Sequence, residues 1–180
     1  TNFYEVNLKE LESLFNKKIT ELKREEVESN KLIEESKKKN IALLVPGDCL
    51  TATTHISLLI EAKKQKISTK VIHGPSILTA VAEIGLSLYK FGAVTSIPFN
   101  TKDIKTPIEV VKKNQQIGLH SLVLLDLNPA ENKYVNIKEA LNYLIKKGIR
   151  KGQLCIGCAR LGNKPIIKKG KAIDLMKEDF

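Results

Sequence analysis

Twice in the first half of the chain, an apolar segment ends in a tight turn and a helix-like segment follows. The first, 40–45, is closed by Pro46-Gly47-Asp48, and the second, Val71-Ile72, by His73-Gly74-Pro75. A strand that turns into a helix leaves backbone N–H groups free at one edge of a sheet. Two such corners on neighbouring strands predict one shared ligand pocket in an α/β protein.

Strand-like and helix-like segments alternate along the first half of the sequence. Strict alternation is typical of a parallel sheet with helices on its faces, because parallel strands need a crossover connection. The predicted strands are 19–22, 40–45, 69–73 and 93–97, and the predicted helices are 8–15, 24–38, 76–84 and one with the core stripe Ile56, Leu59, Ile60 and Ala62.

Pro98 and the polar stretch 100–103 interrupt this alternation, and we place a domain boundary there. The predicted domains are therefore 1–97 and 98–180. The second contains a nearly continuous apolar run, 119–126, which is typical of a strand buried on both faces. The other elements expected in it are helices at 107–116, 136–147 and 172–177 and strands at 153–159 and 165–168.

The chain is strongly basic, which restricts the classes of partner. Lysine and arginine number 30 against 20 acidic residues, giving a formal charge of +10. Nucleic-acid binding as the main function is disfavoured, because arginine is scarce, aromatic residues make up 5% of the chain and the lysines are scattered along helix faces. No apolar run could span a membrane, and no secretory signal opens the sequence. We expect a cytoplasmic protein whose natural chain is longer than this one.

The 3 cysteines predict neither a disulfide framework nor a metal site. Cys155 and Cys158 form a C-x-x-C pair in a strand-like run, where residues three apart point to opposite faces. No second ligand pair at zinc spacing accompanies them. His55 and His73 have no carboxylate or cysteine at catalytic spacing in the sequence. We therefore predict structural cysteines, structural histidines and no bound metal.

Three corners carry residues that either contact a ligand or serve the fold alone. Asp48 can accept hydrogen bonds from a ligand amine or hydroxyl, or cap its own loop. Ser76 can donate to a ligand carboxylate, although capping the next helix is the favoured role. Leu125 and Asp126 end a strand at the edge where open α/β sheets bind ligands, although core packing explains the leucine equally well. The sequence contains no glycine-rich dinucleotide fingerprint and no P-loop.

Motifs spread over almost the whole chain resemble one enzyme family. They are Val45-Pro46-Gly47-Asp48, Ala52-Thr53-Thr54-His55, Val71-Ile72-His73-Gly74-Pro75-Ser76-Ile77, Leu88-Tyr89-Lys90-Phe91-Gly92 and Gly118-Leu119-His120-Ser121-Leu122-Val123-Leu124-Leu125-Asp126. Together they resemble the tetrapyrrole-methylase-like class of S-adenosylmethionine-dependent methyltransferases. The segments 88–92 and 118–120 point to its diphthine branch rather than to the corrin or sirohaem enzymes.

This resemblance implies two α/β domains with S-adenosylmethionine bound in the cleft between them, usually in a homodimer. The implied substrate is the modified histidine of translation elongation factor 2, whose amino group is methylated on the way to diphthamide, with S-adenosylhomocysteine as the other product. We name no catalytic residue and expect no membrane or direct nucleic-acid contact. The family's N-terminal strand with its glycine-rich loop and its C-terminal segment have no counterpart here. Carried over position by position, the cofactor contacts fall on Asp48, Thr51, Ser76, Ile77, Leu125 and Leu161.

The sequence departs from the family pattern at two of these positions and at Cys49, beside Asp48. Thr51 stands where the family often has valine, Cys49 where proline usually follows the Gly-Asp pair, and Leu161 where a smaller residue is common. Two other functions stay open. One is methylation of a tetrapyrrole by the same fold, and the other is a noncatalytic basic module that binds ribosomal RNA or its associated factors.

Overall fold

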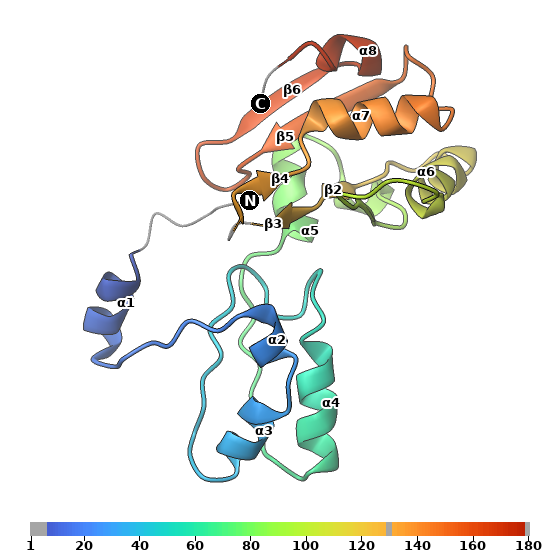
Figure 1. Cartoon of the computed structure of the whole chain (residues 1–180). Coiled ribbons are helices and arrows are strands. Elements are labelled where there is room, and N and C mark those ends of the chain that lie inside the picture. Colours follow the sequence, from blue (N-terminus) through green and yellow to red (C-terminus); the bar gives the residue numbers. More distant parts are fainter. Residues whose placement is uncertain (1–6, 129–130, 179–180) are drawn as a thin grey trace. The chain divides into compact units, whose positions relative to one another are not determined.

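The computed structural model describes residues 7–128 and 131–178, which fall into two compact units (Figure 1). The N-terminal unit ends at Leu78 and the C-terminal unit begins at Thr79. The segment after Thr79 belongs to the C-terminal unit because its strand β1 (Thr95–Ile97) pairs with β2 (Val123–Leu125). Domains of 1–97 and 98–180 remain a prediction.

Short helices make up the regular structure of the N-terminal unit. They are α1 (Leu8–Phe15), α2 (Arg24–Val27), α3 (Lys31–Ser36), α4 (Ile56–Lys64) and the start of α5 (Ile77–Ala80). Asn7 caps α1 as an N-cap does, since its side chain accepts a hydrogen bond from the Lys9 amide at 3.0 Å. The single helix predicted at 24–38 is instead the pair α2 and α3, separated by Glu28, Ser29 and Asn30.

The predicted strands 19–22, 40–45 and 69–73 are wrong as strands, because all three segments run without a ladder. An apolar pattern favours a strand, but a strand also needs a hydrogen-bonded neighbour, and none is present for these segments within 7–128 and 131–178. The predicted core stripe of α4 is also largely exposed. Ala62 is buried, but Ile56 and Ile60 are about half exposed, at 49% and 51%.

The C-terminal unit contains all of the strands in the described residues. After η1 (Val81–Ile84) and η2 (Leu88–Lys90), β1 and β2 pair in parallel, with Thr95 opposite Val123 and Ile97 opposite Leu125. This pair is the part of the predicted parallel sheet that the described residues contain, and β2 is shorter than the predicted strand 119–126. The remaining elements are α6 (Thr106–Gln116), β3 (Leu127–Asn128), β4 (Lys133–Tyr134), α7 (Ile137–Lys146), β5 (Leu154–Ala159), β6 (Ile166–Lys171) and α8 (Ala172–Leu175).

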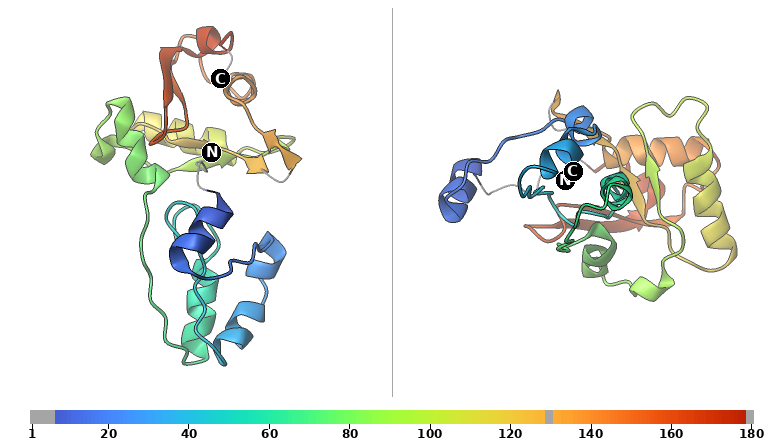
Figure 2. Two further views of the ribbon diagram at one scale, coloured as in Figure 1. Left: turned by 90° about the vertical axis from the view of Figure 1, so that its left-hand side faces the viewer. Right: turned by 90° about the horizontal axis from the view of Figure 1, so that it is seen from below.

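Helices α6 and α7 close the core of this unit around β1 and β2. Ile97 is fully buried, and Ile108 of α6 and Leu144 of α7 lie in the same cluster. The antiparallel pair β5–β6 lies beside α7 and α8 (Figure 2), with Leu175 of α8 packed near Gly170. None of the helices in the described part of the chain has the length and apolar character that crossing a bilayer requires.

A buried asparagine bonds to the residue after one motif segment and to a residue of another. Asn114 of α6 is 3% exposed, and its amide bonds to the backbone of Ala93 and to the Ser121 hydroxyl. Beside it, Phe91 forms a parallel bridge with His120. The segments 88–92 and 118–126, distant in sequence, are therefore held together in one unit.

Candidate functional site

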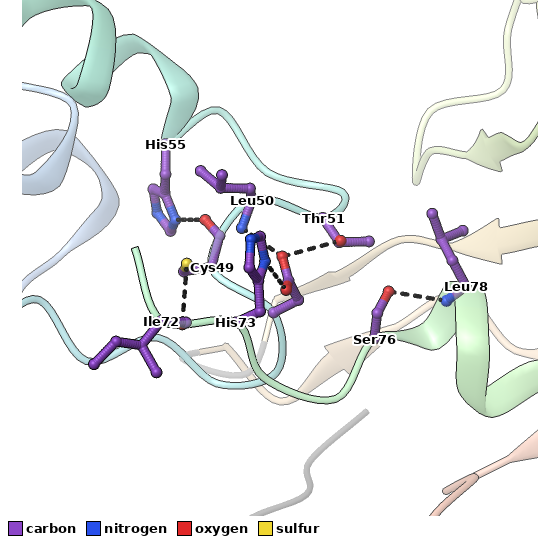
Figure 3. Close-up of polar contacts among 9 residues, drawn as sticks. Cys49, Leu50, Thr51, His55, Ile72, His73, Ser76 and Leu78 are labelled. Atoms are coloured by element: carbon purple, nitrogen blue, oxygen red, sulfur yellow. Dashed lines mark hydrogen bonds and ion pairs between the residues drawn. The ribbon is translucent and has the colours of Figure 1, made fainter. Parts of the chain in front are cut away.

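The carboxylate of Asp48 organises the first corner, and Figure 3 labels the three residues that bond to it, Leu50, Thr51 and His73. Its Oδ1 accepts hydrogen bonds from the Leu50 amide at 2.9 Å and from the Thr51 hydroxyl at 3.1 Å. Its Oδ2 lies 2.8 Å from His73 Nδ1 in the second corner. A carboxylate offers about four acceptor positions, so one remains for a further hydrogen-bond donor.

These contacts keep Asp48 ionised over the physiological range. The Leu50 amide, and after it the His73 side chain, lower the pKa of Asp48 from 3.8 to about 2, against the opposing effect of burial. The Asp48 side chain is 8% exposed, whereas that of His73 is 68% exposed. The corner therefore carries a negative charge in a fixed position. Its own loops cover most of the surface of the carboxylate.

The structural role of His73 stays a prediction, but this residue does have a carboxylate partner in the folded chain. Its partner, Asp48, is 25 residues away in sequence, a separation that no local spacing rule covers. The sequence signal that could have indicated this contact is that both residues lie in the same kind of strand-to-turn corner. His55 does have the predicted structural contact, with Nδ1 3.1 Å from the carbonyl oxygen of Cys49.

The backbones of the two corners touch. A Cβ on Gly74 would lie 2.5 Å from the carbonyl oxygen of Gly47, a distance that real Cβ atoms do not adopt. Gly47 itself has φ +79°, in the left-handed region that glycine adopts without strain. Beside them, Cys49 Sγ donates to the Ile72 carbonyl at 3.7 Å. Glycine at both positions thus allows the corners to form one continuous surface.

Ser76 and Ile77 follow this surface at the start of α5. The Ser76 hydroxyl accepts a hydrogen bond from the Leu78 amide at 3.1 Å (Figure 3), which is the favoured capping role. Ile77 is the first residue of α5 and is partly buried. Asp48, Thr51, Ser76 and Ile77 are therefore brought into one unit by the two corners.

Leu125 and Leu161 belong to the C-terminal unit. Leu125 ends β2 and packs against the core cluster, so its side chain serves the fold. Leu161 is 2% exposed in the loop between β5 and β6, and the next amide, of Gly162, donates to Glu83 Oε2 at 2.9 Å. At both positions it is the backbone N–H and C=O groups, rather than the side chain, that could form hydrogen bonds with a ligand.

Burial affects two of the three thiols. Cys155 and Cys158 are free and partly buried, and burial raises the pKa of both. Within residues 7–128 and 131–178, no group of three or more His, Cys, Asp or Glu side chains is arranged to hold a metal ion.

A hollow of about 510 Å³ lies beside the first corner, lined in part by Thr54, His55 and Glu28. Glu28 accepts hydrogen bonds from Arg24 Nε at 2.8 Å and from the Thr54 hydroxyl at 2.9 Å, and Arg24, then Thr54, lower its pKa. None of the predicted cofactor contacts lines it. Three of its polar side chains, Arg24, Glu28 and Thr54, bond to one another, and we assign the hollow no ligand.

Comparison with known proteins identifies what this arrangement resembles. Residues 4–165 match the family model described as tetrapyrrole (corrin/porphyrin) methylases. The diphthine synthase of Methanosphaera stadtmanae is 42% identical over 171 residues, which cover 88% of this chain and 65% of the relative. That of Methanocaldococcus jannaschii is 43% identical over 184 residues, covering 94% of this chain and 72% of the relative. A crystal structure of diphthine synthase superposes with a TM-score of 0.88 at 37% identity, over 97% of this chain and 70% of that one. This chain therefore spans less than two thirds of the length of the first relative.

Proposed function

Because the chain belongs to the tetrapyrrole methylase family and, within it, to the diphthine synthases, we propose that it methylates the modified histidine of translation elongation factor 2 with S-adenosylmethionine as the donor. The observation that carries this proposal is the superposition on a diphthine synthase over 97% of the chain. The proposed reaction is a step of diphthamide formation, with S-adenosylhomocysteine as the other product.

The geometry of the two corners supports a nucleoside-binding role. Asp48 retains acceptor capacity after its bonds to Leu50, Thr51 and His73. The hydroxyl of Thr51 uses its proton on Asp48, which leaves its lone pairs as acceptors for a ligand donor. Backbone groups at Ser76, Ile77, Leu125 and Leu161 complete the proposed contact set, which suits a bound amino acid and adenosine without further charged side chains.

The cofactor, when bound, supplies a methyl group on a positively charged sulfur. That methyl group would be available for in-line transfer to the nitrogen of the acceptor amine, with S-adenosylhomocysteine as the leaving group. The protein's contribution is alignment of donor and acceptor and exclusion of water. A general base is not required if the amine arrives neutral, and we propose no catalytic side chain.

The proposal extends to the arrangement of the protein. We propose two α/β domains, 1–97 and 98–180, a homodimer, and reaction in the cytoplasm, where the translation factor acts. Sedimentation equilibrium measures the oligomeric state, and a mass of twice 20.1 kDa for this chain supports the dimer.

Calorimetric titration with S-adenosylhomocysteine tests the cofactor assignment. We expect binding that Asp48→Ala weakens by about tenfold or more, because it removes both the remaining acceptor and the loop's anchor. Thr69→Ala, an exposed position in the segment before the second corner, is the control and should bind as the natural chain does. Unchanged affinity in Asp48→Ala would remove that residue from the site.

Transfer of a labelled methyl group identifies the acceptor. With the labelled donor, elongation factor 2 that carries the modified histidine should become labelled, and a porphyrinoid should not. Labelling of the porphyrinoid instead would support the tetrapyrrole reaction. Affinity for ribosomal RNA that falls steeply with salt, without donor binding, would support a noncatalytic basic module.

A further inference from the structure

The hydrogen bond between His73 and Asp48 joins the two corners through side chains. His73 Nδ1 lies 2.8 Å from Asp48 Oδ2, while Oδ1 of the same carboxylate holds Leu50 and Thr51. A carboxylate fixed at both oxygens cannot rotate about its Cβ–Cγ bond without breaking one set of contacts. His73 thus determines where the plane of this carboxylate lies.

We propose that His73 is a positioning residue for the cofactor, acting through Asp48 rather than by touching the cofactor itself. This inference rests on the proposed function. The imidazole holds the carboxylate, and the carboxylate holds the Leu50 amide and the Thr51 hydroxyl in the orientation that a bound donor meets. Preorganisation of this kind increases affinity, because the loop does not have to be ordered at the moment of binding.

The same geometry distinguishes a positioning role from a stabilising one. The His73 side chain is 68% exposed, and a contact between a carboxylate and so exposed a side chain contributes little to the stability of a folded chain. Its partner, however, is almost covered and has three hydrogen bonds within the two corners. Removing the imidazole should therefore leave the unfolding temperature nearly unchanged and still loosen the loop 48–51.

Two variants of His73 and one control separate these roles. His73→Ala removes the donor to Asp48. His73→Asn keeps one, since an asparagine amide nitrogen occupies nearly the position of a histidine Nδ1. Lys70→Ala changes an exposed residue in the same segment, for which no contact with either corner is observed.

Two readouts are measured on each protein. The first is hydrogen exchange of the Leu50 amide without cofactor, and the second is the dissociation constant of S-adenosylhomocysteine by calorimetry. In His73→Ala we expect exchange about three- to tenfold faster and binding about three- to tenfold weaker, as for the loss of one partly exposed charge-assisted bond. His73→Asn should restore both to within about twofold, and Lys70→Ala should change neither.

The outcomes are separable. Exchange and affinity both unchanged in His73→Ala would overturn the inference, and so would faster exchange with unchanged affinity, because the pair would then order the loop without serving the cofactor. A loss that His73→Asn does not rescue would also overturn it. No binding by the natural chain would instead refute the proposed function, and the inference with it, whatever the Leu50 amide does.

Discussion

At the scale of single residues, the site depends on contacts that cross between distant parts of the sequence. The residue types at the corners were evident from the sequence, and so was the alternative that Asp48 holds its own loop. The structure favours that alternative, since Leu50, Thr51 and His73 use most of the hydrogen-bond acceptor positions of the carboxylate. The pairing with His73 was missed because sequence spacing carries no information on which corners touch.

The pKa of Asp48 predicts how the stability of the fold responds to acid. Its pKa of about 2 in the folded chain lies below the ordinary value of 3.8. Its contacts therefore stabilise the fold fully above pH 3.8, and this stabilisation is lost as the pH falls toward 2. The carbon-13 shift of the Asp48 carboxyl, followed by NMR, should titrate with a midpoint near 2. His73→Ala should move the midpoint upward, whereas a natural-chain midpoint at 3.8 or above would contradict these contacts.

At the scale of elements, helices with local signals were predicted well. Helix α7 was expected at 136–147 and is observed at Ile137–Lys146. The agreement is close because both its N-cap and its apolar periodicity depend on residues that are near one another in sequence. Asn136 accepts from the Glu139 amide at 2.8 Å, and Glu139 Oε2 accepts in return from the Asn136 amide at 3.1 Å.

The capping box of α7 predicts a local loss of stability. Asn136→Ala removes the acceptor for the Glu139 amide and should lower the free energy of unfolding by about 1 kcal/mol. Asn136→Asp keeps an acceptor and should be close to neutral. Lys138→Ala, exposed on the same turn, is the control for helix propensity. Urea unfolding of the three variants measures the difference, and equal midpoints for Asn136→Ala and Lys138→Ala would show that the cap contributes nothing.

Strands were predicted less well because a strand is completed by its neighbour. The segments 93–97 and 119–126 pair with each other, although the paired parts, β1 and β2, are only Thr95–Ile97 and Val123–Leu125. The segments 40–45 and 69–73 have the same apolar character but no ladder partner within the described residues. The side-chain pattern predicts which residues of a strand would be buried. Whether the sheet forms depends on a second strand that comes from another part of the chain.

At the scale of the whole molecule, burial is unequal between the two units. Among hydrophobic residues in the described part of the N-terminal unit, only Ile33 and Ala62 are buried, while the C-terminal unit buries an extended cluster around Ile97. Full burial of a large apolar side chain contributes about 1.5–3 kcal/mol. The N-terminal unit, which holds the two corners, should therefore open at a lower free energy than the C-terminal unit.

Hydrogen exchange of two comparable helices tests this difference. Helix α4 buries Ala62, whereas α6 buries Pro107, Ile108, Val111 and Asn114. Without ligand, amides of α4 should exchange at least about tenfold faster than those of α6, since units with few buried contacts open separately. Ligand that binds the folded corners at about 100 times its dissociation constant stabilises them by about 2.7 kcal/mol. S-adenosylhomocysteine should therefore slow exchange in α4 more than in α6. Equal protection of the two helices without ligand would mean that the units unfold together, and the thin core of the N-terminal unit would then not limit its stability.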